Sequence, residues 1–239
     1  MVHAETSTGV CQPMEGIGDL CRKHDCLLLL DTVTSLGGVP LYIDEWKVDL
    51  AYSCSQKGLS CPPGLGPFTM CPRAEAKMTA RQGKVPNWYL DVSLLNQYWG
   101  SDRVYHHTAP VNMNFGMREA LRLLAEEGLD QAWARHRSNA EMLWNGLESL
   151  GLSMHVPAER RLPTLTTVRI PEGVDGKAFS QHLLNNHGIE VGGGLGSLAG
   201  KIWRIGLMGY NSTPENVNRL LNLFETELPR FSGSVAAAA

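Results

Sequence analysis

An unbroken apolar run near the start of the chain, Cys26-Leu27-Leu28-Leu29-Leu30, most constrains what this sequence can fold into. A strand whose residues are all apolar needs cover on both faces, as a strand inside a parallel sheet has. Further strand-like runs follow, and they alternate with helix-like segments such as residues 73–82. We therefore predict an α/β structure, with a mostly parallel sheet and flanking helices, for the first part of the chain.

The pattern changes after Gly151, where short strand-like pieces alternate with helices expected over residues 176–187 and from Ser212 onward. This later part is predicted to be a smaller α+β domain. With the boundary placed near residue 128, the predicted domains are residues 1–128 and 129–239. Three weaker expectations concern a polar, turn-like segment at residues 1–9 and short strands at residues 41–42 and 153–156.

Composition argues against several classes of partner. The net charge of −3 gives no reason to expect nucleic acid or an anionic membrane surface. No apolar run approaches the roughly 20 residues that a membrane-spanning helix needs. The six cysteines contain no CxxC pair, so free thiols are expected rather than a zinc site or a disulfide framework. Adjacent histidines at His106 and His107 should point in opposite directions on an extended loop, so no metal site is expected there.

Two chemically capable side chains stand at the ends of strand-like runs. Asp31 closes the first apolar run, and Lys57 follows the run of residues 48–54. Ligands of α/β sheets bind outside the carboxyl ends of the strands. A carboxylate and an amine at that edge suit pyridoxal phosphate (PLP), because one can keep the pyridine nitrogen protonated while the other forms a Schiff base. An aspartate or a lysine in such a position is, on its own, more often a solvated loop or turn residue. The interpretation as a PLP site therefore depends on the two residues occurring together.

Three further segments are weaker candidates. The hydroxyls of Thr6-Ser7-Thr8-Gly9 suit a phenolic oxygen or a phosphate, or equally a helix cap. Arg204 is a charge within an alternating apolar strand, which suits bidentate capture of a substrate carboxylate or an edge-strand salt bridge. The glycines at residues 192–196 lack the dinucleotide-binding spacing, and we expect a mobile active-site loop or a bend there.

Together these segments resemble the class V, fold-type I PLP aminotransferases, and among them the alanine–glyoxylate / serine–pyruvate group. The resemblance extends from His3 to about Phe231, and its motifs are specific only in combination. It rests on Leu30-Asp31-Thr32-Val33, on Ser53-Cys54-Ser55-Gln56-Lys57-Gly58, and on residues 7–13, 62–64, 105–110, 161–164, 193–196 and 204–209. It implies a partial fold-type I large domain followed by the smaller C-terminal domain.

The resemblance also implies roles for individual residues. Lys57 looks like the Schiff-base lysine and proton shuttle, Asp31 like the partner of the pyridine nitrogen, and Arg204 like the residue that pairs with the substrate carboxylate. The remaining cofactor contacts that it implies are Thr6 near the phenolic oxygen, Val33 under the ring, Gln56 at the phosphate, and Tyr105 and Thr108 at the phosphate of a neighbouring subunit's cofactor. A homodimer would therefore complete each site, with small amino acids and 2-oxo acids as substrates.

Full-length members of that family carry a long portion before the position of His3, with a phosphate-holding loop and an aromatic residue that stacks on the cofactor. The resemblance thus implies that the chain is N-terminally truncated relative to them. Three functions stay open: transamination from alanine or serine to glyoxylate or pyruvate, a catalytically silent chain that keeps dimerisation surfaces, or another class V activity. For that last function, 3-hydroxykynurenine transamination is one candidate; cysteine desulfuration is a weaker one, because Cys54 and Cys61 lie too close to the lysine turn. Family members are peroxisomal, mitochondrial or cytosolic, and the sequence shows no recognisable targeting signal.

Overall fold

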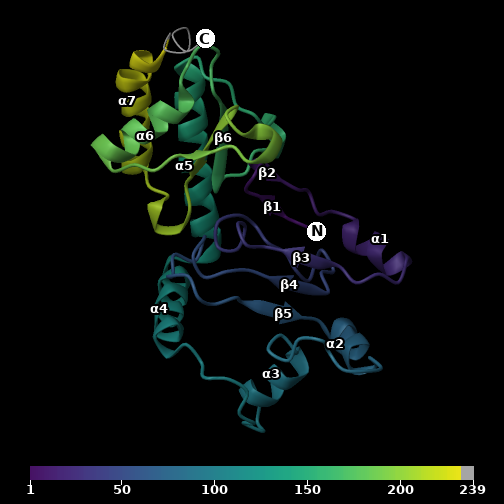
Figure 1. Ribbon diagram of the computed structural model, residues 1–239. Helices are drawn as coiled ribbons and strands as arrows, with labels where there is room; N and C mark the ends of the chain where they lie inside the picture. The colour runs from purple at the N-terminus through teal and green to yellow at the C-terminus, as the bar shows by residue number, and fades with distance from the viewer. Residues whose placement is uncertain (233–239) are drawn as a thin grey trace.

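The structure is a computed structural model that describes residues 1–232. Its first part is built on a three-stranded sheet in the order β3-β4-β5 (Figure 1). These strands are β3 (Leu29–Asp31), β4 (Leu50–Tyr52) and β5 (Phe68–Met70). β3 and β4 are parallel, as predicted for the first apolar runs, whereas β5 pairs antiparallel with β4. The sheet in the first part of the chain is therefore mixed.

Four helices accompany this sheet: α1 (Ile17–Lys23), α2 (Pro72–Thr79), α3 (Val92–Trp99) and α4 (Val111–Glu127). α2 begins at Pro72, because proline has no backbone donor to leave unsatisfied in a first turn. α3 begins after Asp91, whose side chain accepts a hydrogen bond from the Ser93 backbone N–H. Leu30 and Ala51 are buried beneath these elements, together with Met14, Leu28 and Val48.

The first residues of the chain are more ordered than predicted. The turn-like character expected for residues 1–9 is confirmed for residues 6–9, which form the turn of an antiparallel hairpin between β1 (Ala4–Glu5) and β2 (Val10–Cys11), but Ala4 and Glu5 form a strand that was not expected. The residues before it line the open edge of β3, where the Asp31 backbone N–H donates to the Met1 carbonyl at 2.8 Å. Strands of two residues are too short to show an alternating pattern, so their partners rather than their sequence define them.

The second part of the chain contains α5 (Leu129–Ser149), α6 (Gly176–His187), α7 (Pro214–Glu227) and a three-stranded antiparallel sheet in the order β6-β8-β7. Its strands are β6 (Leu165–Arg169), β7 (Gly192–Gly193) and β8 (Ile202–Gly206). The 3-10 turns η1 (Ala158–Arg160), η2 (Gly196–Leu198) and η3 (Gly209–Asn211) lie between these elements, and η4 (Leu228–Phe231) follows α7. The three helices pack on the sheet around Leu147, Phe179, Trp203 and Phe224, which are almost completely buried.

Two expected strands are absent from the described residues. Residues 41–42 have no regular structure and lead into a turn at residues 43–47, where the Tyr42 carbonyl accepts a hydrogen bond from the Trp46 N–H at 2.9 Å. Residues 153–156 contribute only one isolated bridge, between Met154 and Val168. In both segments the apolar residues lie in a loop and pack against a core. Their apolar pattern therefore reflects burial and not a strand.

The two parts are joined by hydrogen bonds as well as by the chain. The Thr164 hydroxyl donates to the Thr34 carbonyl at 2.9 Å, and the Thr167 hydroxyl donates to the Thr8 carbonyl at 2.8 Å. Gly128, at a φ of 86°, separates α4 from α5. The division of the chain at this residue stays a prediction, and residues 233–239 of the second predicted domain lie outside the described residues. Within residues 1–232 no helix has the length and apolar character needed to cross a bilayer.

Candidate active site

Asp31 is the last residue of β3, and two donors hold its carboxylate. Oδ1 accepts a hydrogen bond from the Val33 backbone N–H at 2.8 Å, and Oδ2 accepts one from the Tyr52 hydroxyl at 2.6 Å. The bond to Asp31 raises the pKa of Tyr52 above its ordinary value, which keeps the phenol a donor. A carboxylate has about four acceptor positions. The oriented Asp31 carboxylate can therefore receive a further donor, such as a protonated ring nitrogen.

Lys57 lies in the turn that follows β4, and its side chain is half-buried. Within residues 1–232 its amine makes neither an ion pair nor a hydrogen bond. The side chain lines a pocket of about 470 Å³. The other lining residues are Gln56, Ser60, Cys61, Pro62, Gly206, Met208, Tyr210 and Asn211. An amine without a partner in an open pocket is available as a nucleophile or as a base.

The turn that carries Lys57 is held by its neighbours. The buried Ser55 hydroxyl donates to the Pro62 carbonyl at 2.7 Å and accepts from the Leu65 N–H at 3.3 Å. The turn therefore depends on the Ser55 side chain. A Cβ at Gly58 would lie only 2.3 Å from the Leu36 carbonyl oxygen, so only glycine permits this approach. The Gln56 side chain is left exposed at the pocket.

Arg204 projects from β8, and two carbonyl oxygens hold its guanidinium. Nε donates to the Gly193 carbonyl at 2.7 Å, and Nη1 donates to the Thr6 carbonyl at 3.3 Å. No carboxylate of the described residues forms an ion pair with it, so its charge is not neutralised. Residues alternate faces along a strand, so Arg204 shares a face with Gly206, which lines the Lys57 pocket. The glycine run at 192–193 forms the edge strand β7 beside Arg204.

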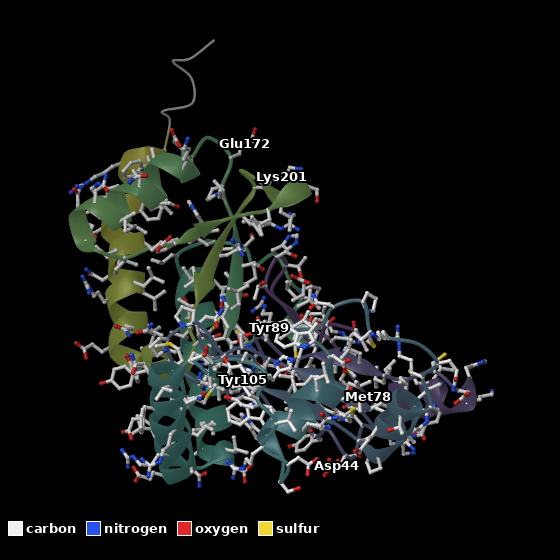
Figure 2. The ribbon with its side chains drawn as sticks, turned by 60° about the horizontal axis from the view of Figure 1, so that its bottom comes forward. Asp44, Met78, Tyr89, Tyr105, Glu172 and Lys201 are labelled. Carbon is white, nitrogen blue, oxygen red and sulfur yellow. The ribbon has the colours of Figure 1, made fainter. Side chains whose placement is uncertain are left out.

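Tyr105 and Thr108 lie apart from this group. The Tyr105 hydroxyl is 3.0 Å from the Thr108 hydroxyl, and Tyr105 is 71% exposed. Figure 2 shows Tyr105 in the part of the molecule that carries α3 and α4, away from Lys201 of the second part. The prediction that the adjacent histidines diverge is wrong, since the Nδ1 atoms of His106 and His107 are 2.9 Å apart. The buried His106 ring also stacks on Trp88.

His136 on α5 has a positioning role that the sequence analysis missed. Its Nδ1 lies 2.7 Å from the Ala132 carbonyl, and its Nε2 accepts a hydrogen bond from the Gly209 N–H at 2.8 Å. The ring is therefore neutral, with its proton on Nδ1. Burial lowers the pKa of His136 below its ordinary value. The available signal was a histidine at helical spacing between the buried Ala132 and Ala140.

The loop that follows β8 is fixed by α5 and by the Lys57 turn. The Arg135 guanidinium donates to the Gly209 and Ser212 carbonyls, each at 2.9 Å. The Ser60 hydroxyl accepts a hydrogen bond from the Tyr210 N–H at 2.8 Å. These bonds fix one wall of the pocket, since Tyr210 and Ser60 both line it.

The predicted site residues thus form four groups in the structure. Asp31 and Val33 lie at the end of β3, Gln56 and Lys57 line the pocket after β4, and Thr6 contacts Arg204. Tyr105 and Thr108 form a separate pair. No contact among the described residues joins Asp31 directly to Lys57; they follow the carboxyl ends of neighbouring parallel strands.

Comparison with known proteins agrees with this arrangement. The sequence profile of the family described as Aminotransferase class-V matches residues 1–220. The chain belongs to this family. As a class-V aminotransferase chain it has relatives and solved structures that extend over nearly all of its length.

An alanine–glyoxylate aminotransferase of Oryctolagus cuniculus is 47% identical over 225 residues, which are 92% of this chain and 57% of the relative. The (S)-ureidoglycine–glyoxylate transaminase of Bacillus subtilis (strain 168) is 38% identical over 255 residues, with 99% and 61% covered. A crystal structure of alanine–glyoxylate aminotransferase from Nostoc sp. has 65% identity and a TM-score of 0.92, with 94% and 59% covered. The chain therefore spans less than two thirds of the length of these relatives, and the predicted fold-type I α/β class is confirmed.

The class-V family implies PLP, and the side chains of this structure fit that group. Lys57 supplies an unpaired amine, Asp31 an oriented carboxylate with unused lone pairs, and Arg204 a cationic group that no acid of the described residues neutralises. An amine that can form a Schiff base, an acceptor for a ring N–H and a cation for a carboxylate are the groups that a pyridine aldehyde and a carboxylate substrate require.

The buried His136 predicts a pH dependence of stability. In the unfolded chain its pKa is near 6.5, whereas in the folded chain burial lowers it. The unfolded state therefore binds more protons as the pH falls below 6.5, and the free energy of unfolding decreases. Urea titrations should show that this decrease is smaller in His136→Gln, by up to about 1.4 kcal/mol per pH unit.

His24→Gln is the matched control, because His24 is an exposed histidine outside the pocket. It should keep the pH dependence of the unchanged chain. Identical pH profiles for His136→Gln and the unchanged chain would show that His136 is not held neutral by the fold.

Proposed function

We propose that this chain catalyses PLP-dependent transamination, moving an amino group from alanine or serine to glyoxylate or pyruvate, with Lys57 as the Schiff-base lysine. The observation that carries the proposal is the unpaired Lys57 amine in a pocket after β4, beside the strand that ends in Asp31. The names of the relatives from Oryctolagus cuniculus and Nostoc sp. support the choice of alanine and glyoxylate.

The residues have complementary tasks in this reaction. When bound, PLP supplies a carbonyl that condenses with amines and a ring that accepts an electron pair. Asp31, oriented by Tyr52 and the Val33 N–H, holds a proton on the ring nitrogen. Lys57 Nζ removes the proton from the substrate Cα and returns a proton, which is general acid–base work by one amine.

The other cofactor contacts are also proposals. Val33 packs under the ring, since it follows Asp31 closely and is half-buried. Gln56 offers an exposed amide to the phosphate from the wall of the Lys57 pocket. Thr6 lies near the phenolic oxygen, and its carbonyl contact with Arg204 supports a location beside the substrate. Tyr105 and Thr108, bonded to each other, reach the phosphate held by a second subunit.

Arg204 binds the substrate carboxylate in this proposal. Two carbonyls orient its guanidinium and leave its charge uncompensated, so a carboxylate can pair with it. The alternative edge-strand salt bridge has no carboxylate partner among residues 1–232.

We also propose that the chain functions as a homodimer. Large apolar side chains are exposed along residues 88–129, among them Trp99 at 61% and Phe115 at 67%. One groove is lined by Tyr89, Leu90, Trp99, Leu121 and Leu129 of this set. Exposed apolar surface that is grouped in this way is typical of protein–protein contacts. The same region carries Tyr105, whose proposed role requires a second subunit.

The lysine assignment predicts where PLP attaches. Folded chain with added PLP should show the visible absorbance of bound cofactor, and borohydride should fix the label on Lys57. Lys57→Ala should lose both signals, whereas Lys84→Ala, which changes an exposed lysine, should keep them. Peptide mapping identifies the labelled residue.

A label on another lysine in Lys57→Ala would contradict the lysine assignment. A folded, unlabelled wild-type chain would instead support the catalytically silent alternative.

The proposed role of Arg204 predicts a change in KM. Arg204→Gln should raise KM for glyoxylate about tenfold to a hundredfold, since a charge-assisted hydrogen bond contributes about 1.5–3 kcal/mol. The change in kcat should be smaller, because the carboxylate is bound in both ground and transition states. Arg169→Gln, an exposed arginine on the neighbouring strand, should leave KM unchanged. Equal KM values for Arg204→Gln and the wild type would contradict the assignment.

The homodimer proposal predicts a mass of two chains in sedimentation equilibrium. Phe115→Asp should shift that mass towards one chain, because a charge would be desolvated in the interface. Leu20→Asp changes an exposed leucine on α1 and should leave the dimer intact. A monomeric wild type at all concentrations would contradict the proposal.

A further inference from the structure

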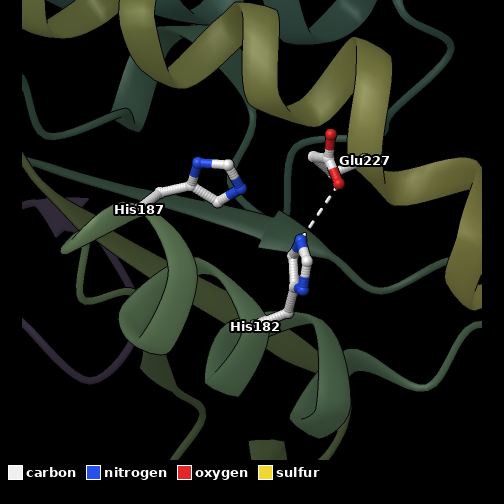
Figure 3. Close-up of side chains that lie close together, drawn as sticks. All are labelled: His182, His187 and Glu227. Carbon is white, nitrogen blue, oxygen red and sulfur yellow. Dashed lines mark hydrogen bonds and ion pairs between the residues drawn. The ribbon is translucent and has the colours of Figure 1, made fainter.

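The described residues contain a group of metal-ligating side chains away from the Lys57 pocket. His182, His187 and Glu227 place one ligand atom each within 4.8 Å of one another. The two histidines project from α6 and the glutamate from α7 (Figure 3). We propose that these three residues bind a divalent transition-metal cation of the zinc type, with water completing the coordination.

The distances suit such an ion. In a tetrahedral zinc site with bonds of about 2.1 Å, neighbouring ligand atoms lie roughly 3.4 Å apart. His182 Nε2 and Glu227 Oε2 are already 3.0 Å apart. The His187 ring centroid is 5.3 Å from that of His182, so a side-chain rotation brings its nitrogen into range. Zinc would displace the proton shared by His182 and Glu227, and that proton leaves to solvent.

The surroundings hold the ligands in place. The side chain of His182 is only 19% exposed and that of Glu227 12%. The Asn186 amide lies 2.7 Å from His182 Nδ1. The contacting atom is Asn186 Nδ2. A flip of this amide turns its oxygen to the ring, where it accepts the Nδ1 proton and leaves the Nε2 lone pair for a metal, as outer-shell partners of zinc-binding histidines do.

Helix ends add a favourable field. His187 is the last residue of α6, and Glu227 is the last residue of α7. The carboxyl end of a helix carries partial negative charge, so two such ends close together favour a cation. Two arginine side chains already lie at these helix ends. Arg219 donates to the His187 carbonyl, and Arg230 pairs with Glu227 Oε2 at 2.6 Å.

Arg230 therefore competes with the metal for the same oxygen. It is 65% exposed, so its side chain can leave without creating a cavity. This competition distinguishes the proposed site from adventitious binding, because removing Arg230 should strengthen metal binding while removing a ligand should weaken it.

The test is calorimetric titration of the folded chain with Zn²⁺, paired with Co²⁺ absorption spectra. His187→Gln should weaken Zn²⁺ binding at least about tenfold, by analogy with losses in other zinc sites. Arg230→Gln should strengthen it, and His24→Gln should leave it unchanged. Zn²⁺ should also raise the midpoint of thermal unfolding of the wild type, because a ligand that binds only the folded state stabilises it.

The six free cysteines are the competing ligands. A Co²⁺ spectrum with thiolate charge-transfer absorption that persists in His187→Gln would place the metal at cysteines and overturn the proposal. Absence of Zn²⁺ binding, or equal affinity in the wild type, His187→Gln and Arg230→Gln, would overturn it as well.

Discussion

The parallel pairing of β3 with β4 is the constraint on which the candidate active site depends. Beyond the last paired residues, the Thr32 hydroxyl donates to the Tyr52 carbonyl at 2.8 Å, and the Ser53 hydroxyl donates to the Thr32 carbonyl at 3.0 Å. These bonds fix the register in which Asp31 faces Tyr52. Since a slip of one residue would turn every side chain to the opposite face, the same register orients the Asp31 carboxylate and sends the Lys57 turn to the same edge.

The second part of the chain completes this edge through hydrogen bonds to backbone groups. Arg204 binds carbonyls of Thr6 and Gly193, and His136 accepts the Gly209 N–H from the loop that borders the Lys57 pocket. A guanidinium held by carbonyls keeps its full charge, whereas a paired carboxylate would compensate it. The site thus combines a rigid backbone with charged side chains left available for a ligand.

Elements with complete local signals were predictable. α6 spans the expected residues 176–187 because Asp175 caps its start and Gly188, at a φ of 65°, ends it. α7 begins after Thr213, whose hydroxyl accepts from the Asn216 N–H. The neutral His136 and the His182–Glu227 contact were not predictable, because each depends on a partner distant in sequence. The β1–β2 hairpin was not predictable because strands of two residues show no alternating pattern. The placement of Asp31 and Lys57 at strand ends was predictable, whereas the hydroxyl contact between Tyr105 and Thr108 was not.

The sequence alone determined the chemistry and the local elements: which runs are buried strands, where helices are capped, and which residues carry an amine, a carboxylate and a guanidinium. Its motifs also sufficed for the family. Only the tertiary structure decided that Lys57 is unpaired, that Arg204 is bound by carbonyls, and that α6 and α7 bring His182 to Glu227. Local propensities act over a few residues, whereas the electrostatic environment of a side chain is set by whichever groups folding packs against it.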